Sequence, residues 1–241
     1  MHKIDKTEHF FDIIKCPFKV KKNVPDSVSL VSNLCDHAEN NLKIINLKRE
    51  KNTKEKFGVC CPALTLEKRE SVIKFIEWVE LLKILGAEKI HISNRLLHPE
   101  LLNVAKYYEQ QGLVELTPFQ EPSTYDNFVN HDFWTFQFLT INDCFHRVKN
   151  LYNYVLIIDT NEVVLPMMKQ DETWYDLFQR LDESENSNAF VAQSVPYSFE
   201  EGKKFKNVPK YHYMLTHVEV RLHFISVLLE NYKVLNKIQT F

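Results

Sequence analysis

Glycine is scarce in this 241-residue chain, which contains only four glycines, and they stand far apart. No G-x-G-x-x-G fingerprint and no G-x-x-x-x-G-K-[ST] loop can be found in the sequence. Dinucleotide-binding and P-loop proteins need such glycine clusters, because the backbone must approach the phosphates closely. The lack of a glycine-rich loop therefore argues against both of these classes of nucleotide-binding protein.

Strong charge of one sign and long apolar runs are also missing. The formal net charge is -2, so the chain lacks the basic footprint that nucleic-acid binding requires, and no nucleic-acid partner is expected. The longest apolar run, Leu222 to Leu229, is far too short to span a bilayer. The N-terminus lacks the apolar stretch of a signal peptide. This chain is therefore not expected to carry an anchor or a leader of its own.

The five cysteines form no C-x-x-C pair, which makes a structural zinc site an unfavoured interpretation. The spacing favours five buried thiols. The alternative is a disulfide between Cys16 and Cys35, formed in an oxidising compartment. No N-x-S/T glycosylation acceptor occurs anywhere in the chain.

Strands and helices alternate over the middle of the chain. The pattern predicts strand, helix, strand, helix, strand, helix and strand, at residues 57–64, 72–85, 88–93, 101–111, 113–116, 133–149 and 154–159. Gly86 and Gly112 each follow a helix, where a left-handed residue reverses the chain. The last of these strands is apolar on both faces, as expected at the centre of a parallel sheet. The predicted fold class is α/β, with a mostly parallel sheet flanked by helices.

The two ends of the chain differ from this middle part. Residues 1–55 are rich in lysine and asparagine and are interpreted as an irregular N-terminal extension, and residues 56–241 as the main domain. After Pro166 a short helix, Trp174 to Leu181, is predicted with Asp171 as a possible N-cap. Ala189 to Phe199 follows as a strand, which Pro196 places at an edge or a bulge. Trp78 and Trp174 are expected in the core.

Three oxygen-bearing side chains follow the most apolar strand, namely Asp159, Asn161 and Glu162. Ligands of open parallel sheets bind beyond the carboxyl ends of the strands, where Asp159 stands. Carboxylate and amide oxygens are the ligands that Mg²⁺ and Mn²⁺ prefer, and such an ion would bridge a diphosphate. The alternative is structural: Asp159 only ends the strand and Glu162 faces solvent.

Several segments, in this order and spacing, resemble glycosyltransferase family 92. The residues that carry the resemblance are Phe57 to Leu64, Ile76 to Glu80, Leu85 to Ala87, Gln137, Ile141 to Cys144, Ile158 to Glu162, Val164 and Pro166, with Pro25 to Val31 before them. The resemblance covers the chain from about Phe57 onward. It implies a GT-A fold, which is Rossmann-like, and an inverting transfer of a hexose, usually galactose from UDP-galactose, to a glycan acceptor.

The same resemblance implies a metal site and a location. Asp159, Asn161 and Glu162 correspond to the family's D-x-D-E segment, so Mn²⁺ or Mg²⁺ is the expected cofactor. Asn161 departs from the family's usual aspartate and removes one negative charge. Family members typically act in the Golgi from a membrane anchor, and they continue beyond the equivalent of residue 241. We therefore expect the native protein to carry an anchor absent from this chain, and the domain to continue at its C-terminus.

Other polar residues are candidates for donor binding or catalysis. Ser93 and Asn94, at the end of the second predicted strand and directly after it, would reach the donor from a carboxyl end. Gln137, Asn142 and Asp143 lie on the predicted helix 133–149, where they either approach the donor or form a polar helix face. Inversion requires a general base for the acceptor hydroxyl, for which Glu200, Glu201 and Glu219 are candidates by position.

Two other functions compete with this hypothesis. The substitution at Asn161 is compatible with a weak or inactive family member that binds glycans or partners. An unrelated α/β enzyme that binds another phosphate ligand at this sheet is the third option.

Overall fold

The computed structural model describes residue 14 and residues 25–33, 35–45, 56–66, 71–119, 133–166, 168–182, 189–193 and 224–229. The chain divides into two compact units, Met1–Leu47 and Lys48–Phe241. In the first unit β1 (Ser27–Val28) pairs antiparallel with β2 (Leu42–Lys43). The side chain of Asn40 closes this pair, because its amide accepts from Leu30 N at 2.8 Å and donates to Leu30 O at 2.7 Å.

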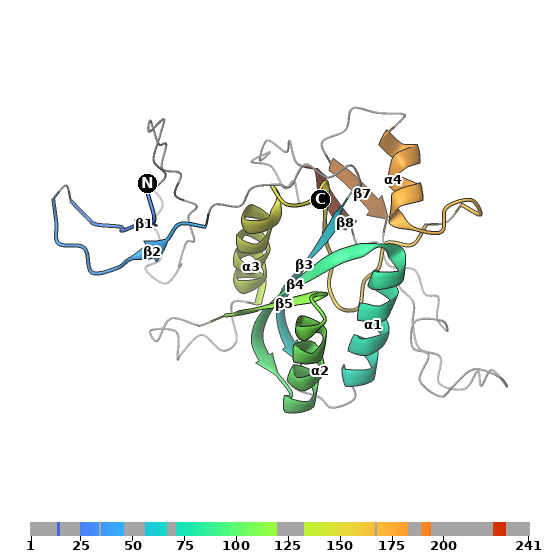
Figure 1. The fold of residues 1–241 in the computed structure, drawn as a ribbon, viewed down its shortest axis with the longest axis horizontal. Helices are drawn as coiled ribbons and strands as arrows, with labels where there is room; N and C mark the ends of the chain where they lie inside the picture. Colours follow the sequence, from blue (N-terminus) through green and yellow to red (C-terminus); the bar gives the residue numbers. More distant parts are fainter. Residues whose placement is uncertain are drawn as a thin grey trace, which may run out of the picture. The chain divides into compact units, whose positions relative to one another are not determined.

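The second unit is built on one six-stranded sheet in the order β5-β4-β3-β6-β8-β7 (Figure 1). Four neighbouring strands are parallel: β5 (Val114–Pro118), β4 (Ala87–Leu97), β3 (Phe57–Leu66) and β6 (Tyr154–Ile157). The strands β8 (Phe224–Leu229) and β7 (Ala189–Gln193) extend the sheet antiparallel beyond β6. The predicted α/β fold with a mostly parallel sheet is confirmed.

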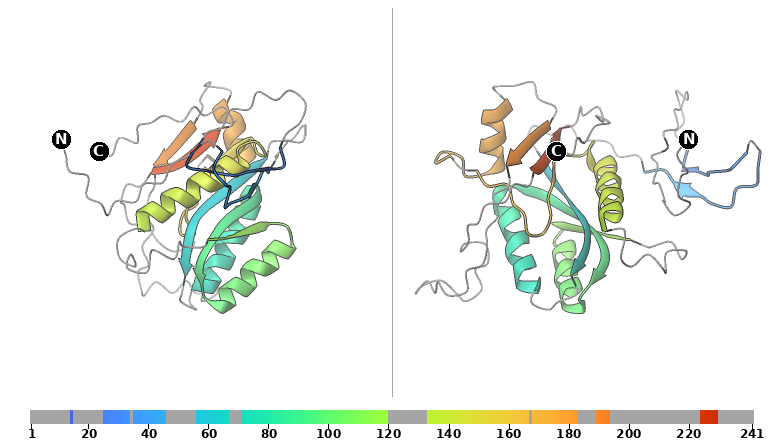
Figure 2. Two further views of the ribbon diagram at one scale, coloured as in Figure 1. Left: turned by 90° about the vertical axis from the view of Figure 1, so that its left-hand side faces the viewer. Right: turned by 180° about the vertical axis from the view of Figure 1, so that it is seen from behind.

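Helices cover both faces of this sheet (Figures 1 and 2). The helices α1 (Ser71–Leu85), α2 (Pro99–Gln110) and α4 (Trp174–Asp182) contribute buried residues to the larger core. The helix α3 (Phe133–Val148) packs on β3 and β6 and contributes to a separate, smaller core. The two cores are the two sides of one sheet, because residues of opposite parity on β3 and β6 enter them.

Alternation along β3 and β6 explains this division. Val59 and Leu156 are fully buried in the larger core, whereas Cys60 and Val155 are buried in the smaller one. Successive side chains of a strand point to opposite faces, so a strand that is apolar at every position belongs inside a sheet covered on both sides. The strand before Asp159, predicted at the centre of a parallel sheet, is an interior strand as expected, but only β3 is parallel to it and its other neighbour, β8, is antiparallel.

Gly58 of β3 packs directly against the ring of Tyr152. A Cβ at this position would overlap the ring of Tyr152, at 2.7 Å from Cε2. No other residue type therefore fits beneath Tyr152 without moving the ring or the strand. The glycine allows the tyrosine to lie flat against β3.

The helix ends follow their sequence signals with one exception. Gly86 and Gly112 have φ values of 113° and 78°, the left-handed conformations expected just beyond α1 and α2. The prediction of Asp171 as the N-cap of α4 was wrong. Thr173 takes that place, because Asp176 Oδ2 accepts from Thr173 N at 2.8 Å in a capping-box arrangement. Asp171 is instead buried and paired with Arg180 at 2.6 Å.

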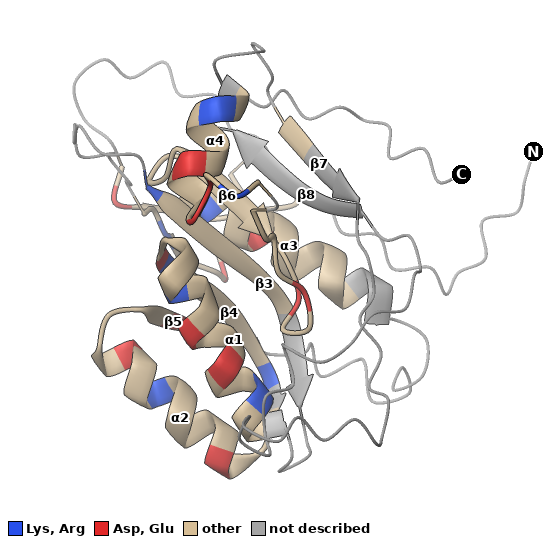
Figure 3. Cartoon of the chain, turned by 90° about the vertical axis from the view of Figure 1, so that its right-hand side faces the viewer, with Lys and Arg blue, Asp and Glu red and all other residues tan. Residues whose placement is uncertain are grey.

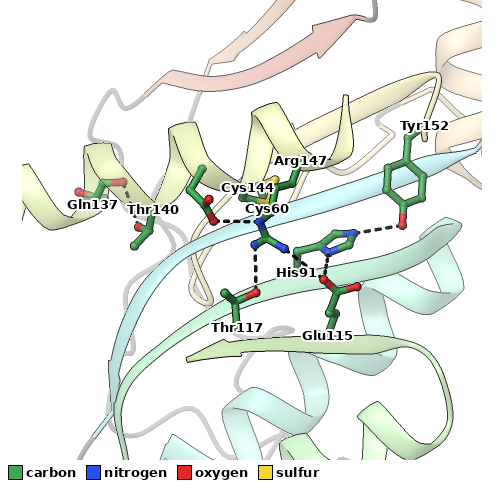
Figure 4. The surroundings of a disulfide bond; sticks show 10 residues. Cys60, His91, Glu115, Thr117, Gln137, Thr140, Cys144, Arg147 and Tyr152 are labelled. Carbon is green, nitrogen blue, oxygen red and sulfur yellow. Dashed lines mark hydrogen bonds and ion pairs between the residues drawn. A yellow bond between two sulfur atoms is a disulfide. The ribbon is translucent and has the colours of Figure 1, made fainter. Parts of the chain in front are cut away.

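A disulfide joins Cys60 of β3 to Cys144 of α3, with a Cα–Cα distance of 5.9 Å (Figure 4). The interpretation of all five cysteines as buried thiols was therefore wrong. The alternative pairing of Cys16 with Cys35 was wrong as well, because Cys35 is a free and exposed thiol. Cys16 itself lies outside the described residues. Only the fold brings positions 84 residues apart in the sequence to bonding distance.

The last part of the sheet departs most from expectation. Residues 224–229 of the run Leu222 to Leu229, which the sequence marks only as apolar, form β8, which separates β6 from the edge strand β7. The edge position predicted for the strand beginning at Ala189 is confirmed. Both acidic and basic residues lie along α1 and along α2 in Figure 3. Within the described part of the chain, no helix is long and apolar enough to cross a bilayer.

Candidate active site at the carboxyl end of β6

The strand order creates a reversal point between β3 and β6. From β3 the chain proceeds outward to β4 and β5, and it then returns through α3 to place β6 on the other side of β3. At such a point the loops that follow the two neighbouring strands diverge to opposite faces and leave a crevice at the carboxyl edge. The segment that follows β6, residues 158–166, starts at this edge.

This segment begins with a tight turn from Asp159 to Glu162. Glu162 N donates to Asp159 O at 3.0 Å, and Glu162 Oε2 accepts from Asp159 N at 3.0 Å. Asp159 Oδ1 accepts in turn from Thr160 N at 2.6 Å. Asp159 and Glu162 are half-buried, and Asn161 between them is exposed. The two carboxylates are thus held on the same turn, and each uses one oxygen to bind the turn's backbone.

Two buried tryptophans hold the backbone of the segment from outside the turn. Trp78 of α1 donates from Nε1 to Glu162 O at 2.8 Å. Trp174 of α4 donates from Nε1 to Val164 O at 2.7 Å. Both indoles are fully buried, which confirms the prediction that they belong to the core. The segment has no regular structure of its own, so these bonds replace the ladder that a strand would supply.

Cys61 of β3 reports the electrostatics of this turn. Burial raises the pKa of the Cys61 thiol well above its ordinary value, and the nearby carboxylates of Asp159 and Glu162 raise it further. A buried thiol beside two carboxylates remains protonated and uncharged. The negative charge of the two carboxylates therefore acts as far as Cys61 on the neighbouring strand β3.

The oxygen donors of the turn fit a hard divalent cation. Among the residues that the structure describes, no three His, Cys, Asp or Glu side chains gather closely enough to hold a metal by themselves. Mg²⁺ and similar ions are nevertheless commonly bound through one or two carboxylates, with substrate phosphates completing the shell. Asp159 and Glu162 each keep one oxygen without a hydrogen bond from the described residues, and the exposed Asn161 offers an amide carbonyl.

Ser93 and Asn94 do not stand at the end of their strand, as predicted. Both lie within β4, because this strand continues to Leu97. Asn94 pairs in register with Pro118, the last residue of β5, and Asn94 O accepts from Phe119 N at 2.9 Å. Ser93 is buried, whereas Asn94 is half-buried. Both stay near the carboxyl edge, and their contact with a donor remains a prediction.

The three candidates on α3 have structural contacts. Asp143 binds Arg147 Nε at 2.9 Å through Oδ2, and Asn142 donates to Phe138 O of its own helix at 2.8 Å. Gln137 is half-buried in the second turn of α3, and its backbone carbonyl accepts from Thr140 Oγ1 at 3.1 Å. These contacts fit the alternative stated from the sequence, in which the three residues form a polar helix face. A role of Gln137, Asn142 and Asp143 in donor binding remains a prediction.

A polar network on the α3 side was not signalled by the sequence (Figure 4). The guanidinium of Arg147 binds Glu115 at 3.2 Å and Thr117 at 2.9 Å, which ties α3 to β5. His91 is buried, with Nε2 3.1 Å from the Tyr152 hydroxyl and Nδ1 3.5 Å from Glu115 Oε1. The contact with His91 lowers the pKa of Glu115 to about 2, burial opposes this shift, and the charges of Arg147 and Lys89 add to it.

The candidates for the general base, Glu200, Glu201 and Glu219, lie outside the described residues. Of the predicted site, the structure therefore describes the turn after β6, the two residues on β4 and the three on α3. It brings Asp159 and Glu162 together directly through the backbone of one turn. The sequence could have indicated that each buried tryptophan needs an acceptor for its N–H, but not which carbonyl group accepts it.

The mostly parallel α/β sheet with helices on both faces has the architecture expected of a GT-A-like fold. The sequence pattern of glycosyltransferase family 92 matches residues 55–227, and the chain belongs to this family. A search of curated proteins found no match. The family makes the chain a glycosyltransferase, whose substrates are by class a nucleotide-sugar donor and a glycan acceptor.

Proposed function

We propose that this protein transfers galactose from UDP-galactose to a glycan acceptor, with inversion at the sugar carbon. The acidic turn at the carboxyl end of β6 carries the proposal. It places Asp159 and Glu162 together beside the point where the strand order reverses, which is where open α/β sheets bind nucleotides. Family membership supports the donor class, and galactose is the sugar that the family resemblance implies.

In this proposal the turn holds Mn²⁺ or Mg²⁺ through Asp159, Glu162 and the amide oxygen of Asn161. The ion would supply neutralisation of the negative charge that develops on the departing diphosphate. The two carboxylates are held in orientation by the turn. Asp159 and Glu162 each accept a backbone N–H with one carboxylate oxygen and leave the other for the ligand. For an inverting transfer, a carboxylate takes the proton of the acceptor hydroxyl, and Glu200 and Glu201 are the residues we propose for it.

Calorimetric titration of the 241-residue chain with UDP, in Mn²⁺ and in EDTA, tests the metal site. We expect UDP to bind in Mn²⁺ and to bind far more weakly in EDTA. Glu162→Gln should reduce the Mn²⁺-dependent affinity about 10-fold to 100-fold, as other losses of a ligand or its support do. The matched control is Glu88→Gln, which removes the same charge from an exposed residue at the amino end of β4. Equal losses in both variants would refute the site.

A screen of UDP-sugars for hydrolysis and transfer tests the reaction and the sugar. UDP-galactose is expected to be consumed faster than UDP-glucose or the two UDP-N-acetylhexosamines. The anomeric configuration of the product, read by NMR, decides between inversion and retention. A β-linked product from the α-linked donor is expected, and an α-linked product would refute inversion.

A catalytically weak or inactive family member is the second candidate, and Asn161 favours it. Where the family usually has aspartate, this exposed amide contributes no charge to the turn. The test applies if the chain binds UDP but transfers no sugar. If the missing charge at position 161 causes this inactivity, Asn161→Asp should restore transfer. Failure of Asn161→Asp to restore transfer would favour a glycan- or partner-binding role instead.

We also propose that the protein works in the lumen of the Golgi. The bond between Cys60 and Cys144 supports this, since disulfides persist in oxidising compartments and are rare in the cytosol. Alkylation with a mass-tagged maleimide, applied to the denatured protein taken directly from its native cells, should leave this pair unmodified. Two extra tags, lost after mutation of Cys60 and Cys144, would contradict a lumenal location.

A further inference from the structure

Two indole N–H groups, from two helices, meet the backbone of the segment that follows β6. The acceptors differ in one respect. Trp78 binds the carbonyl of Glu162, which is the last residue of the acidic turn, whereas Trp174 binds the carbonyl of Val164, two residues beyond it. Both donors are fully buried, and both distances are short. The two bonds are therefore chemically equivalent, but only one acts on the turn.

The turn transmits the position of Glu162 to Asp159. Glu162 N donates to Asp159 O, and Asp159 N donates to the Glu162 carboxylate, each at 3.0 Å. These reciprocal bonds couple the two residues, so a displacement of the Glu162 backbone displaces both carboxylates together. The turn itself belongs to no helix or strand, and Trp78 ties it to the 15-residue helix α1.

From this arrangement we propose that Trp78 is a positioning residue for the carboxylates of Asp159 and Glu162. The inference rests on the proposed function of the turn. By holding the carbonyl of Glu162, the indole of Trp78 fixes the backbone of the turn and thereby the orientation of the two carboxylates. Groups that orient metal ligands in this way typically change metal affinity about 10-fold to 100-fold when they are removed.

The sharpest test removes the N–H and keeps the shape. Incorporation of 3-benzothienylalanine at position 78 replaces the indole N–H by sulfur in a ring system of nearly the same size. The same replacement at position 174 is the matched control, because it loses an equally buried bond beyond the turn. Trp78→Phe and Trp174→Phe form a second pair by ordinary mutagenesis. The modified and native chains are titrated with UDP in Mn²⁺ and in EDTA, and their thermal unfolding is recorded.

We expect the change at position 78 to weaken Mn²⁺-dependent UDP binding by about 10-fold or more and to leave binding in EDTA unchanged. The change at position 174 should lower the melting temperature to a similar extent without this loss. If the native chain binds UDP without any dependence on Mn²⁺, the proposed function fails and the role of Trp78 fails with it. If the native chain shows that dependence and both replacements, or neither, reduce it, only the positioning role of Trp78 is refuted.

Discussion

The bond between Cys60 and Cys144 allows the most direct quantitative test of this fold. It closes a loop of 84 residues, which contains β4, α1, α2 and β5 and connects both faces of the sheet. Loop-closure entropy for that separation amounts to about 4.5 kcal/mol at 25 °C. Loss of the bond should therefore lower the free energy of unfolding by about that amount. A typical domain is stable by only about 5–15 kcal/mol in total, so the effect is large.

The perturbation is the double variant Cys60→Ala/Cys144→Ala, and the assay is urea unfolding followed by circular dichroism and by tryptophan fluorescence. With an m-value of about 3 kcal/mol/M, the midpoint should fall by about 1.5 M. Both sulfurs are buried, so part of any loss comes from packing and not from the cross-link.

Cys61→Ala measures that packing contribution. Cys61 is the next residue of β3, is also buried, and carries a free thiol. Removing one buried sulfur there should cost about 1 kcal/mol, comparable to a buried methylene. If the double variant loses no more than about twice the Cys61→Ala loss, the cross-link adds nothing beyond packing, and the entropic reasoning is refuted.

Three further predictions concern other parts of the chain. Gly58→Ala should destabilise the protein by about 1–3 kcal/mol, because the added methyl meets the Tyr152 ring. In urea unfolding, Gly58→Ala should cost less stability when it is introduced into a Tyr152→Ala variant than when it is introduced into the native chain. The folded-state pKa of Glu115 is lowered from 4.5 to about 2, so its stabilising contribution is complete above pH 4.5 and is lost as the pH falls to about 2. Glu115→Gln should flatten the pH dependence of the melting temperature in that window, and an unchanged slope would contradict the assignment. Asn161→Asp should tighten Mn²⁺-dependent UDP binding in calorimetry because it adds a negative charge to the turn, and weaker binding would argue against Asn161 as a ligand.

Sequence periodicity predicted the four parallel strands of the sheet well because these elements bury continuous apolar patterns. The strand at Tyr154 is apolar at every position, and that pattern by itself required cover on both faces. The helices ending before Gly86 and Gly112 were recognisable because a left-handed glycine ends a helix locally. Such signals involve residues close together in the chain, so they can be recognised without the fold.

The antiparallel strand β8 was missed for a physical reason. Its apolar run of residues 224–229 is too short to distinguish a strand from a buried helix segment by pattern alone. Its pairing with β6 joins residues about seventy positions apart, such as Leu156 with Val227. The second strand was ended too early, at Ser93, because β4 continues through polar residues, which periodicity interprets as a turn.

Asp159, Asn161 and Glu162 could be proposed as site residues from local sequence, because an acidic turn after an apolar strand is a contiguous pattern. Which atoms hold that turn was decided by the packing of α1 and α4, which brings Trp78 and Trp174 onto carbonyl groups of residues 162 and 164. The pairing of Cys60 with Cys144 was decided in the same way. Contacts between distant residues depend on how helices pack on the sheet, and that packing energy is shared among many side chains and leaves no mark at any one position.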